Sequence, residues 1–180
     1  KTFRMHKDLI EILREGTLLQ KGEAPKVVDH ILMHPEGLQI VIDGMSHEDA
    51  GIRMRSLYCA EQICRKHPEW IQAYKSEMIA SLDYWEQYPE MAQLLPLLLS
   101  HLALEGQELD LTLEFVRRRL KQSKKTFEQV NCLQALTDHA CRNSWLIDEV
   151  LATFEEYEVR GGAAINARIR KLRKKLAKLG

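Results

Sequence analysis

The chain has 180 residues, 45% of them hydrophobic and 29% charged, and its 26 basic and 26 acidic residues give a formal net charge of zero. This composition is typical of a soluble globular chain, and the longest apolar stretch, MAQLLPLLLSHLALEG, is too short for a membrane span. The length fits one domain with a buried core, and the scarcity of Gly and Pro favours helices.

The charges are distributed unevenly along the chain. Residues 159–180 hold eight basic residues and no acidic one, so residues 1–158, with 18 basic and 26 acidic residues, carry a balance of −8. A second basic cluster lies between residues 117 and 125. The basic end could be a solvated face, attract an acidic protein or the acidic remainder of this chain, or bind nucleic-acid phosphates.

The first 33 residues predict a helical cap, since Met5, Leu9, Ile12 and Leu13 form one apolar stripe. Further along, Pro-Glu-x-x-Gln occurs three times, beginning at Pro35, Pro68 and Pro89. Proline is tolerated in the first turn of a helix, and glutamate there faces the positive end of the helix dipole. The recurring motif therefore predicts helix starts rather than a repeated catalytic or metal site.

The same signals along the whole chain predict helices and no strand. The segment LQIVID is the best strand candidate, but its Pro-Glu start favours a buried helix. Thr126 and Gln129 have the spacing of a capping box. The predicted helices are 3–15, 24–33, 35–45, 48–66, 69–85, 89–105, 108–121, 126–142, 145–158 and 162–178.

The helices from residue 35 onward can be arranged in pairs. Their first members begin near 35, 69, 108 and 145, at spacings of 34, 39 and 37 residues, which is the period of an α-solenoid. The helix 89–105 is apolar nearly all round, as an inner helix would be. The last helix has one apolar stripe opposite basic residues, as a terminal helix requires: Ile165, Ile169, Leu172, Leu176 and Leu179.

The segment LQIVIDGMSHEDAGIRMRSLYCAEQI resembles a HEAT repeat, through Asp43, Ile52, Arg53 and Ala60. The last repeat is similar in its second helix, whereas the middle repeats depart from the pattern: the second has Pro96 inside a helix and the third lacks the Asp. The resemblance implies an all-α fold, a right-handed α-α superhelix of about four helix pairs. The chain would then be a single domain, 1–180, with an N-terminal helical cap at 1–33 and repeats over 35–180.

No catalytic, metal or cofactor motif is recognised in the sequence. His30 and His34 are four residues apart, but no third ligand is indicated, and no Gly-rich phosphate loop or H-E-x-x-H occurs. None of the four cysteines forms a C-x-x-C pair. We expect the cysteines to be buried thiols in a reducing, cytoplasmic setting, no cofactor or metal, and no catalytic residue.

A HEAT-like stack would line its inner groove with its second helices. The polar candidates for binding there are Arg53, Arg55, Gln62, Gln93, His101, Gln134, Asp138, Asn166 and Arg170. Trp85, in an aromatic cluster between two predicted helices, is expected to pack in the core rather than to bind.

These features predict a non-catalytic scaffold or adaptor that binds a protein partner through its concave surface. The alternative is a nucleic-acid-binding protein that uses its basic C-terminal helix. DNA glycosylases that remove alkylated purines are similar in fold class but rely on aromatic residues and an Asp in the concave face. Here the tryptophans Trp70, Trp85 and Trp145 fall on or beside first helices, which argues against that activity.

Overall fold

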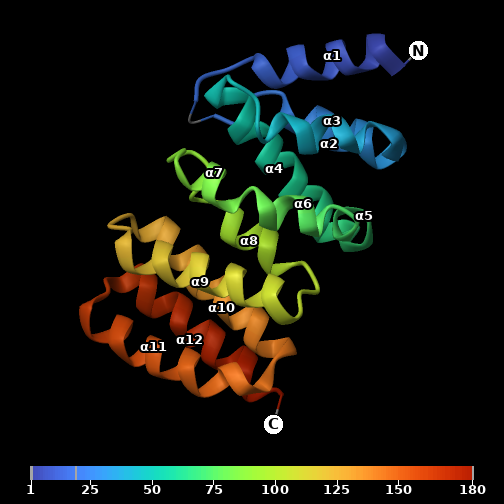
Figure 1. The fold of residues 1–180 in the computed structure, drawn as a ribbon. Helices are drawn as coiled ribbons and strands as arrows, with labels where there is room; N and C mark the ends of the chain where they lie inside the picture. Colours follow the sequence, from blue (N-terminus) through green and yellow to red (C-terminus); the bar gives the residue numbers. More distant parts are fainter. Residues whose placement is uncertain (1, 19, 180) are drawn as a thin grey trace. The chain divides into compact units, whose positions relative to one another are not determined.

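The computed structural model describes residues 2–18 and 20–179, with side chains from Asp8 onward. This part of the chain is helical and contains no strand. It forms two compact units, one ending at Leu98 and one beginning at Leu99, and each is described here by itself (Figure 1).

The first unit is built around one long helix, α4 (Ala50–Lys66), which packs against α1, α2, α3 and α5. Asp49 caps α4, because its Oδ1 accepts a hydrogen bond from the Ile52 amide at 3.0 Å. That bond holds the pKa of Asp49 below its ordinary value. The other elements of this unit are α1 (Thr2–Arg14), α2 (Ala24–Met33), η1 (Pro35–Gly37), α3 (Leu38–Gly44), α5 (Pro68–Gln72), α6 (Lys75–Ala80), α7 (Leu82–Glu86) and α8 (Leu95–Ser100), which crosses the boundary.

The predicted helices 69–85 and 89–105 are wrong in extent. The first is divided into α5, α6 and α7, and the second is reduced to α8, with turns over residues 89–94. Pro68 opens a helix as predicted, whereas Pro89 does not. Pro96 explains the late start of α8, because proline has no N–H to donate and is accommodated in the first turn of a helix but not inside it.

The second unit contains two helix pairs, and the predicted helices there agree closely with the structure. The pairs are α9 (Gly106–Gln122) with α10 (Thr126–Arg142), and α11 (Ile147–Arg160), preceded by η2 (Ser144–Leu146), with α12 (Ala163–Ala177). Helix α10 contacts α9, α11 and α12 and is the most buried element of this unit. Thr126 is the first residue of α10 and makes no capping hydrogen bond, so the capping box is wrong.

The predicted apolar stripes are confirmed with two exceptions. Ile165, Ile169, Leu172 and Leu176 are buried under α12, whereas Leu179 is 52% exposed. In the N-terminal stripe Leu9 and Leu13 are buried and Ile12 is half-buried, while the Met5 side chain lies outside the described part.

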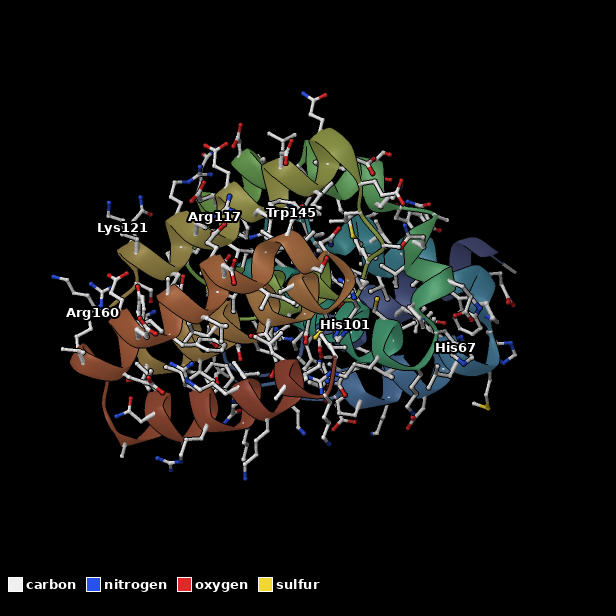
Figure 2. The ribbon with its side chains drawn as sticks, turned by 90° about the horizontal axis from the view of Figure 1, so that it is seen from below. His67, His101, Arg117, Lys121, Trp145 and Arg160 are labelled. Atoms are coloured by element: carbon white, nitrogen blue, oxygen red, sulfur yellow. The ribbon has the colours of Figure 1, made fainter. Side chains whose placement is uncertain are left out.

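The three tryptophans have different environments. Trp85 is buried, as expected, and its Nε1 donates to Ser46 Oγ at 3.0 Å. Trp70 stacks on His67, with ring centroids 4.1 Å apart. Trp145 is 62% exposed (Figure 2).

The cysteines are free thiols, with Cys59, Cys64 and Cys132 buried and Cys141 half-buried. Burial raises the pKa of Cys64 and of Cys132 to about 12 and also raises that of Cys59. Across residues 2–18 and 20–179, none of the helices combines the length and the apolar character needed to cross a lipid bilayer.

Candidate functional site

The best-developed polar site lies in the second unit, where α10 and α12 run next to each other. Gln134 and Asp138 are one helical turn apart on α10, so their side chains share a face. Gln134 Nε2 donates a hydrogen bond to Asp138 Oδ1 at 2.8 Å. The sequence predicted both residues as binding candidates, and the structure brings them together.

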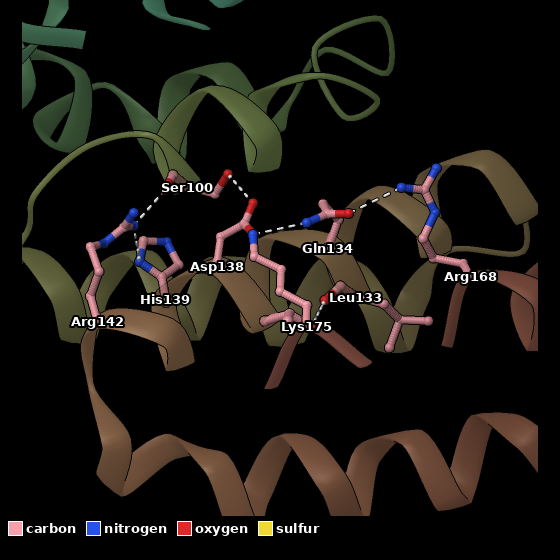
Figure 3. A network of polar contacts seen from close by, with 9 residues as sticks. Ser100, Leu133, Gln134, Asp138, His139, Arg142, Arg168 and Lys175 are labelled. Carbon is pink, nitrogen blue, oxygen red and sulfur yellow. Dashed lines mark hydrogen bonds and ion pairs between the residues drawn. The ribbon is translucent and has the colours of Figure 1, made fainter. Parts of the chain in front are cut away.

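Asp138 connects this face of α10 to its neighbours (Figure 3). Lys175 Nζ of α12 lies 2.6 Å from Asp138 Oδ1, and Ser100 Oγ donates to Asp138 Oδ2 at 3.2 Å. The Asp138 side chain is only 12% exposed, and these partners supply the hydrogen bonds and the positive charge that a buried carboxylate needs. One turn away, Arg168 of α12 donates to Gln134 Oε1 at 3.0 Å. These four side chains, Gln134, Asp138, Arg168 and Lys175, form a polar row. The row holds α12 against α10 through one ion pair and one hydrogen bond from a charged donor.

A buried histidine lies beside this row. His139 is 1% exposed, and its Nδ1 lies 3.3 Å from a guanidinium nitrogen of Arg142, which also donates to the Ser100 carbonyl. Burial lowers the pKa of His139 to about 4, helped by the charge of Arg142. Burial likewise lowers the pKa of Arg142. His139 is therefore neutral at pH 7.

Next to the polar row, a cavity of about 400 Å³ opens between the first turns of α10 and α12. Its floor is apolar, because two alanines on α12, Ala164 and Ala167, leave space beside Val130 and Phe127 of α10. Phe127 is 56% exposed, which is unusual for an aromatic side chain without a polar group. The lining residues, which define what we call the α10–α12 groove, are Thr126, Phe127, Val130, Ala164, Ala167, Arg168 and Lys171.

The rim of the groove is cationic. Arg168 and Lys171 of α12 line it, three residues apart, and none of the described lining residues is acidic. Further cations lie on the exposed face of the same helix. Within the described part of the chain, no ion pair joins these four side chains to an acid: Arg170, Lys171, Lys174 and Lys178.

The remaining predicted binding residues lie elsewhere. Arg170 is exposed on α12 and points away from the polar row, while Gln93 and His101, before and after α8, are half-buried. Gln62 donates to Glu61 on α4, and Asn166 is half-buried near the start of α12.

Arg53 and Arg55 are buried inside the first unit. Arg53 pairs with Glu90, lies 3.9 Å from the centroid of the Tyr88 ring and donates to the His47 and Glu48 carbonyls. Arg55 is 1% exposed and donates to four backbone carbonyls. Both guanidinium groups are occupied by contacts within the fold.

Sequence reasoning missed Phe127, Ala164 and Ala167 as parts of a site. Phe127 lies inside the predicted capping box, and the alanines lie in the last predicted helix, where Ala167 contributes only to the resemblance to a HEAT repeat. A usable signal was present, because residues 127, 130, 134 and 138 of α10 and residues 164, 168, 171 and 175 of α12 recur at three- and four-residue spacing, and residue 167 follows 164 by three.

The histidine pair noted in the sequence forms a ring contact, with the centroids of His30 and His34 4.8 Å apart. Among the residues that the structure describes, no group of three or more His, Cys, Asp or Glu side chains is placed to hold a metal ion. The sequence matches no protein-family model, and no curated protein or solved structure matches the chain.

Proposed function

We propose that this chain is a HEAT-like repeat protein that acts as a non-catalytic scaffold and binds a protein partner in the α10–α12 groove. The helix pairs α9–α10 and α11–α12 are what two consecutive repeats of a right-handed α-α superhelix would supply. Their second helices would form part of the concave surface.

The observation that carries this proposal is the combination of an apolar floor and a charged rim in one groove. Protein interfaces place apolar and aromatic side chains at the centre and polar groups around them. Phe127, Val130 and the two alanines supply such a centre, and Arg168 and Lys171 supply the charged rim. The rim's positive charge favours a partner segment with acidic side chains around an apolar anchor.

Nucleic-acid binding is the second candidate, supported by the four cations on α12 and directly after it that make no ion pair among the described residues. Cations that neutralise phosphates bind through counterion release, and such binding weakens steeply with salt. Among the described lining residues, the side chains that can hydrogen-bond to base edges are Thr126, Arg168 and Lys171, and Arg168 is already bonded to Gln134. We therefore favour the protein partner.

A photo-crosslinking amino acid placed at position 127 of the full chain tests the proposal. Leu111 of α9, which is 43% exposed, provides the control position. We expect a crosslinked protein at position 127 that is absent at position 111. With that protein purified, Phe127→Ala should weaken binding by roughly tenfold or more, whereas Leu111→Ala should leave it unchanged.

The nucleic-acid candidate is tested in parallel with duplex DNA over a salt series. Crosslinks to nucleic acid at position 127, or DNA binding that falls steeply with salt and is reduced by Lys171→Gln with Lys174→Gln, would replace the protein-partner proposal. Equal crosslinking at positions 127 and 111 would contradict both.

A further inference from the structure

A second pocket of the same unit is lined by cations from three different segments. It has a volume of about 230 Å³ and lies between the α9–α10 turn and the α11–α12 turn. Lys121 comes from the end of α9, Lys124 from the turn that follows it, and Arg160 from the end of α11. Figure 2 shows Lys121 and Arg160 at the same end of the unit. None of the described lining residues is acidic.

Hydrogen bonds inside the protein fix the first wall of this pocket. Ser123 Oγ donates to the buried Glu128 carboxylate at 2.8 Å and accepts from the Lys125 amide at 3.1 Å. Arg119 holds the other oxygen of Glu128, and Gln129 Nε2 donates to the Ser123 carbonyl at 2.8 Å. The backbone that carries Lys124 is therefore held in place.

The second wall is tied to the first by one buried bond. Tyr157 O–H donates to the Leu120 carbonyl at 2.9 Å, which joins the end of α11 to the end of α9. Gly161 then allows the tight turn into α12, because a Cβ there would lie 2.4 Å from the Tyr157 carbonyl oxygen. The fold thus holds Arg160 across from the two lysines.

Among the described residues, two of the three charges at this pocket are not balanced by an ion pair, and the third is balanced only by an exposed one. Lys121 and Lys124 make no ion pair within the part of the chain that the structure describes. Arg160 lies 4.1 Å from the centroid of the Tyr157 ring and pairs with Glu156 at 2.9 Å, but both side chains of that pair are at least half exposed. Such a pair is weak and easily exchanged for a stronger anion. Three cations held together repel one another, and an anion between them would relieve that repulsion.

We propose that this pocket, defined by Lys121, Lys124 and Arg160, binds a phosphate group, either as inorganic phosphate or as a phosphomonoester. A phosphomonoester carries nearly two negative charges and three acceptor oxygens, enough for one oxygen per cation, whereas a carboxylate has two oxygens and one charge. The guanidinium of Arg160 adds a planar pair of donors that suits phosphate oxygens. The volume admits such a group but is below the range of pockets that enclose a whole drug-sized ligand.

The test is a titration of the full chain with inorganic phosphate, and separately with phenyl phosphate, at constant ionic strength. Backbone amide NMR shifts of residues 123–125 and 161–162 report on the pocket. We expect saturable shifts at these amides. The double variant Lys121→Gln with Lys124→Gln should weaken binding at least tenfold, and the matched double variant Lys171→Gln with Lys174→Gln on α12 should not.

A second pair of variants separates a built site from a general effect of net charge. Glu156→Gln removes the competitor for Arg160 and should tighten phosphate binding several-fold. Glu114→Gln makes the same charge change at the Arg118 pair of α9 and should have no effect. Shifts that grow linearly without saturation, or equal effects of the two substitutions, would overturn the proposal. Tighter binding of phenyl phosphate would assign an esterified ligand, and exclusion of it would assign the free anion.

Discussion

At the scale of single residues, the polar side chains of this protein differ mainly in whether they already have hydrogen-bond or ion-pair partners within the fold. Asp138 has three partners from three segments and is nearly buried. Arg170, another residue predicted from the sequence to bind a partner, is exposed and unpaired among the described residues. Residue type and helical position do not distinguish these cases, because two of the three partners of Asp138, Ser100 and Lys175, lie 38 and 37 residues away in the chain.

The buried His139 side chain predicts how the stability of the protein depends on pH. Its pKa is about 4 in the folded protein, because the charged form is desolvated, and about 6.5 in an unfolded chain. The stability associated with neutral His139 is therefore complete above pH 6.5 and is lost as the pH falls from 6.5 towards 4. Linkage gives a loss of about 3 kcal/mol over that interval.

We expect His139→Leu to abolish this part of the pH dependence. Urea unfolding at pH 7 and pH 4.5 measures it: between the two, the variant should lose about 2 to 3 kcal/mol less stability than the wild type. His34→Gln, at an exposed position, serves as the control and should behave as the wild type does. An unchanged pH dependence in His139→Leu would contradict the burial of a neutral imidazole.

At the scale of elements, the ends of the helices are stabilised by long-range side chains as well as by local caps. Arg55 of α4 reaches the end of α1 and the following loop, where it donates to the carbonyls of Leu13, Arg14, Thr17 and Gln20. Gly51 leaves room for it, since a Cβ there would lie 2.2 Å from an Arg55 guanidinium nitrogen. One buried side chain thus satisfies carbonyl groups at the end of α1 and in the loop that follows it.

Arg55→Met should accordingly destabilise the protein. The substitution keeps much of the side-chain volume but removes the donors for buried carbonyls, at an expected cost of about 2 to 4 kcal/mol in the free energy of unfolding. Chemical unfolding monitored by circular dichroism measures this. Arg170→Met, an exposed and unpaired position of another helix, should change stability by less than about 0.5 kcal/mol. A similar small effect at Arg55 would show that water can replace its hydrogen bonds.

At the scale of the whole molecule, the charge balance divides along the boundary between the units. Residues 1–98 hold 11 basic and 15 acidic residues, a balance of −4, and residues 99–180 hold 15 and 11, a balance of +4. Both proposed binding sites lie in the positive unit. The zero net charge of the chain is therefore the sum of a negative and a positive unit, and the positive unit suits the anionic ligand and the acidic partner that we propose.

The two units should also differ in resistance to unfolding. The α-helices of residues 67–98 in the first unit are only five or six residues long and have few internal hydrogen bonds, whereas the helix pairs of the second unit have helices of 14 to 17 residues. We expect Cys64, which α4 buries near α5, to react with iodoacetamide at a lower urea concentration than Cys132 of α10. Peptide mass spectrometry after timed labelling measures both thiols in the same sample.

Native protein provides the reference for that experiment, because burial raises the pKa of both thiols to about 12 and keeps them unreactive. Cys141, half-buried, should be the first thiol to react without urea. Simultaneous labelling of Cys64 and Cys132 at every urea concentration would mean that the units unfold together.

The sequence alone determined the features that depend on local periodicity. Helix 126–142 was predicted with the bounds that the structure shows, and the last helix was predicted to within one residue at each end, with its buried stripe. Both have a strong apolar repeat and no internal proline. LQIVID is helical, as its Pro-Glu start indicated, because the proline and glutamate directly before it favour a helix start.

Only the tertiary structure decided how the weakly periodic segment 69–105 breaks into short helices and which charged side chains remain available. Lys175 is paired with Asp138, 37 residues away, while Lys171, four residues earlier, lines an open groove. Local pattern places both lysines on one face of one helix. Their different environments follow from α10, which packs beside α12. Contacts between distant segments cannot be read from the spacing of residues within either segment.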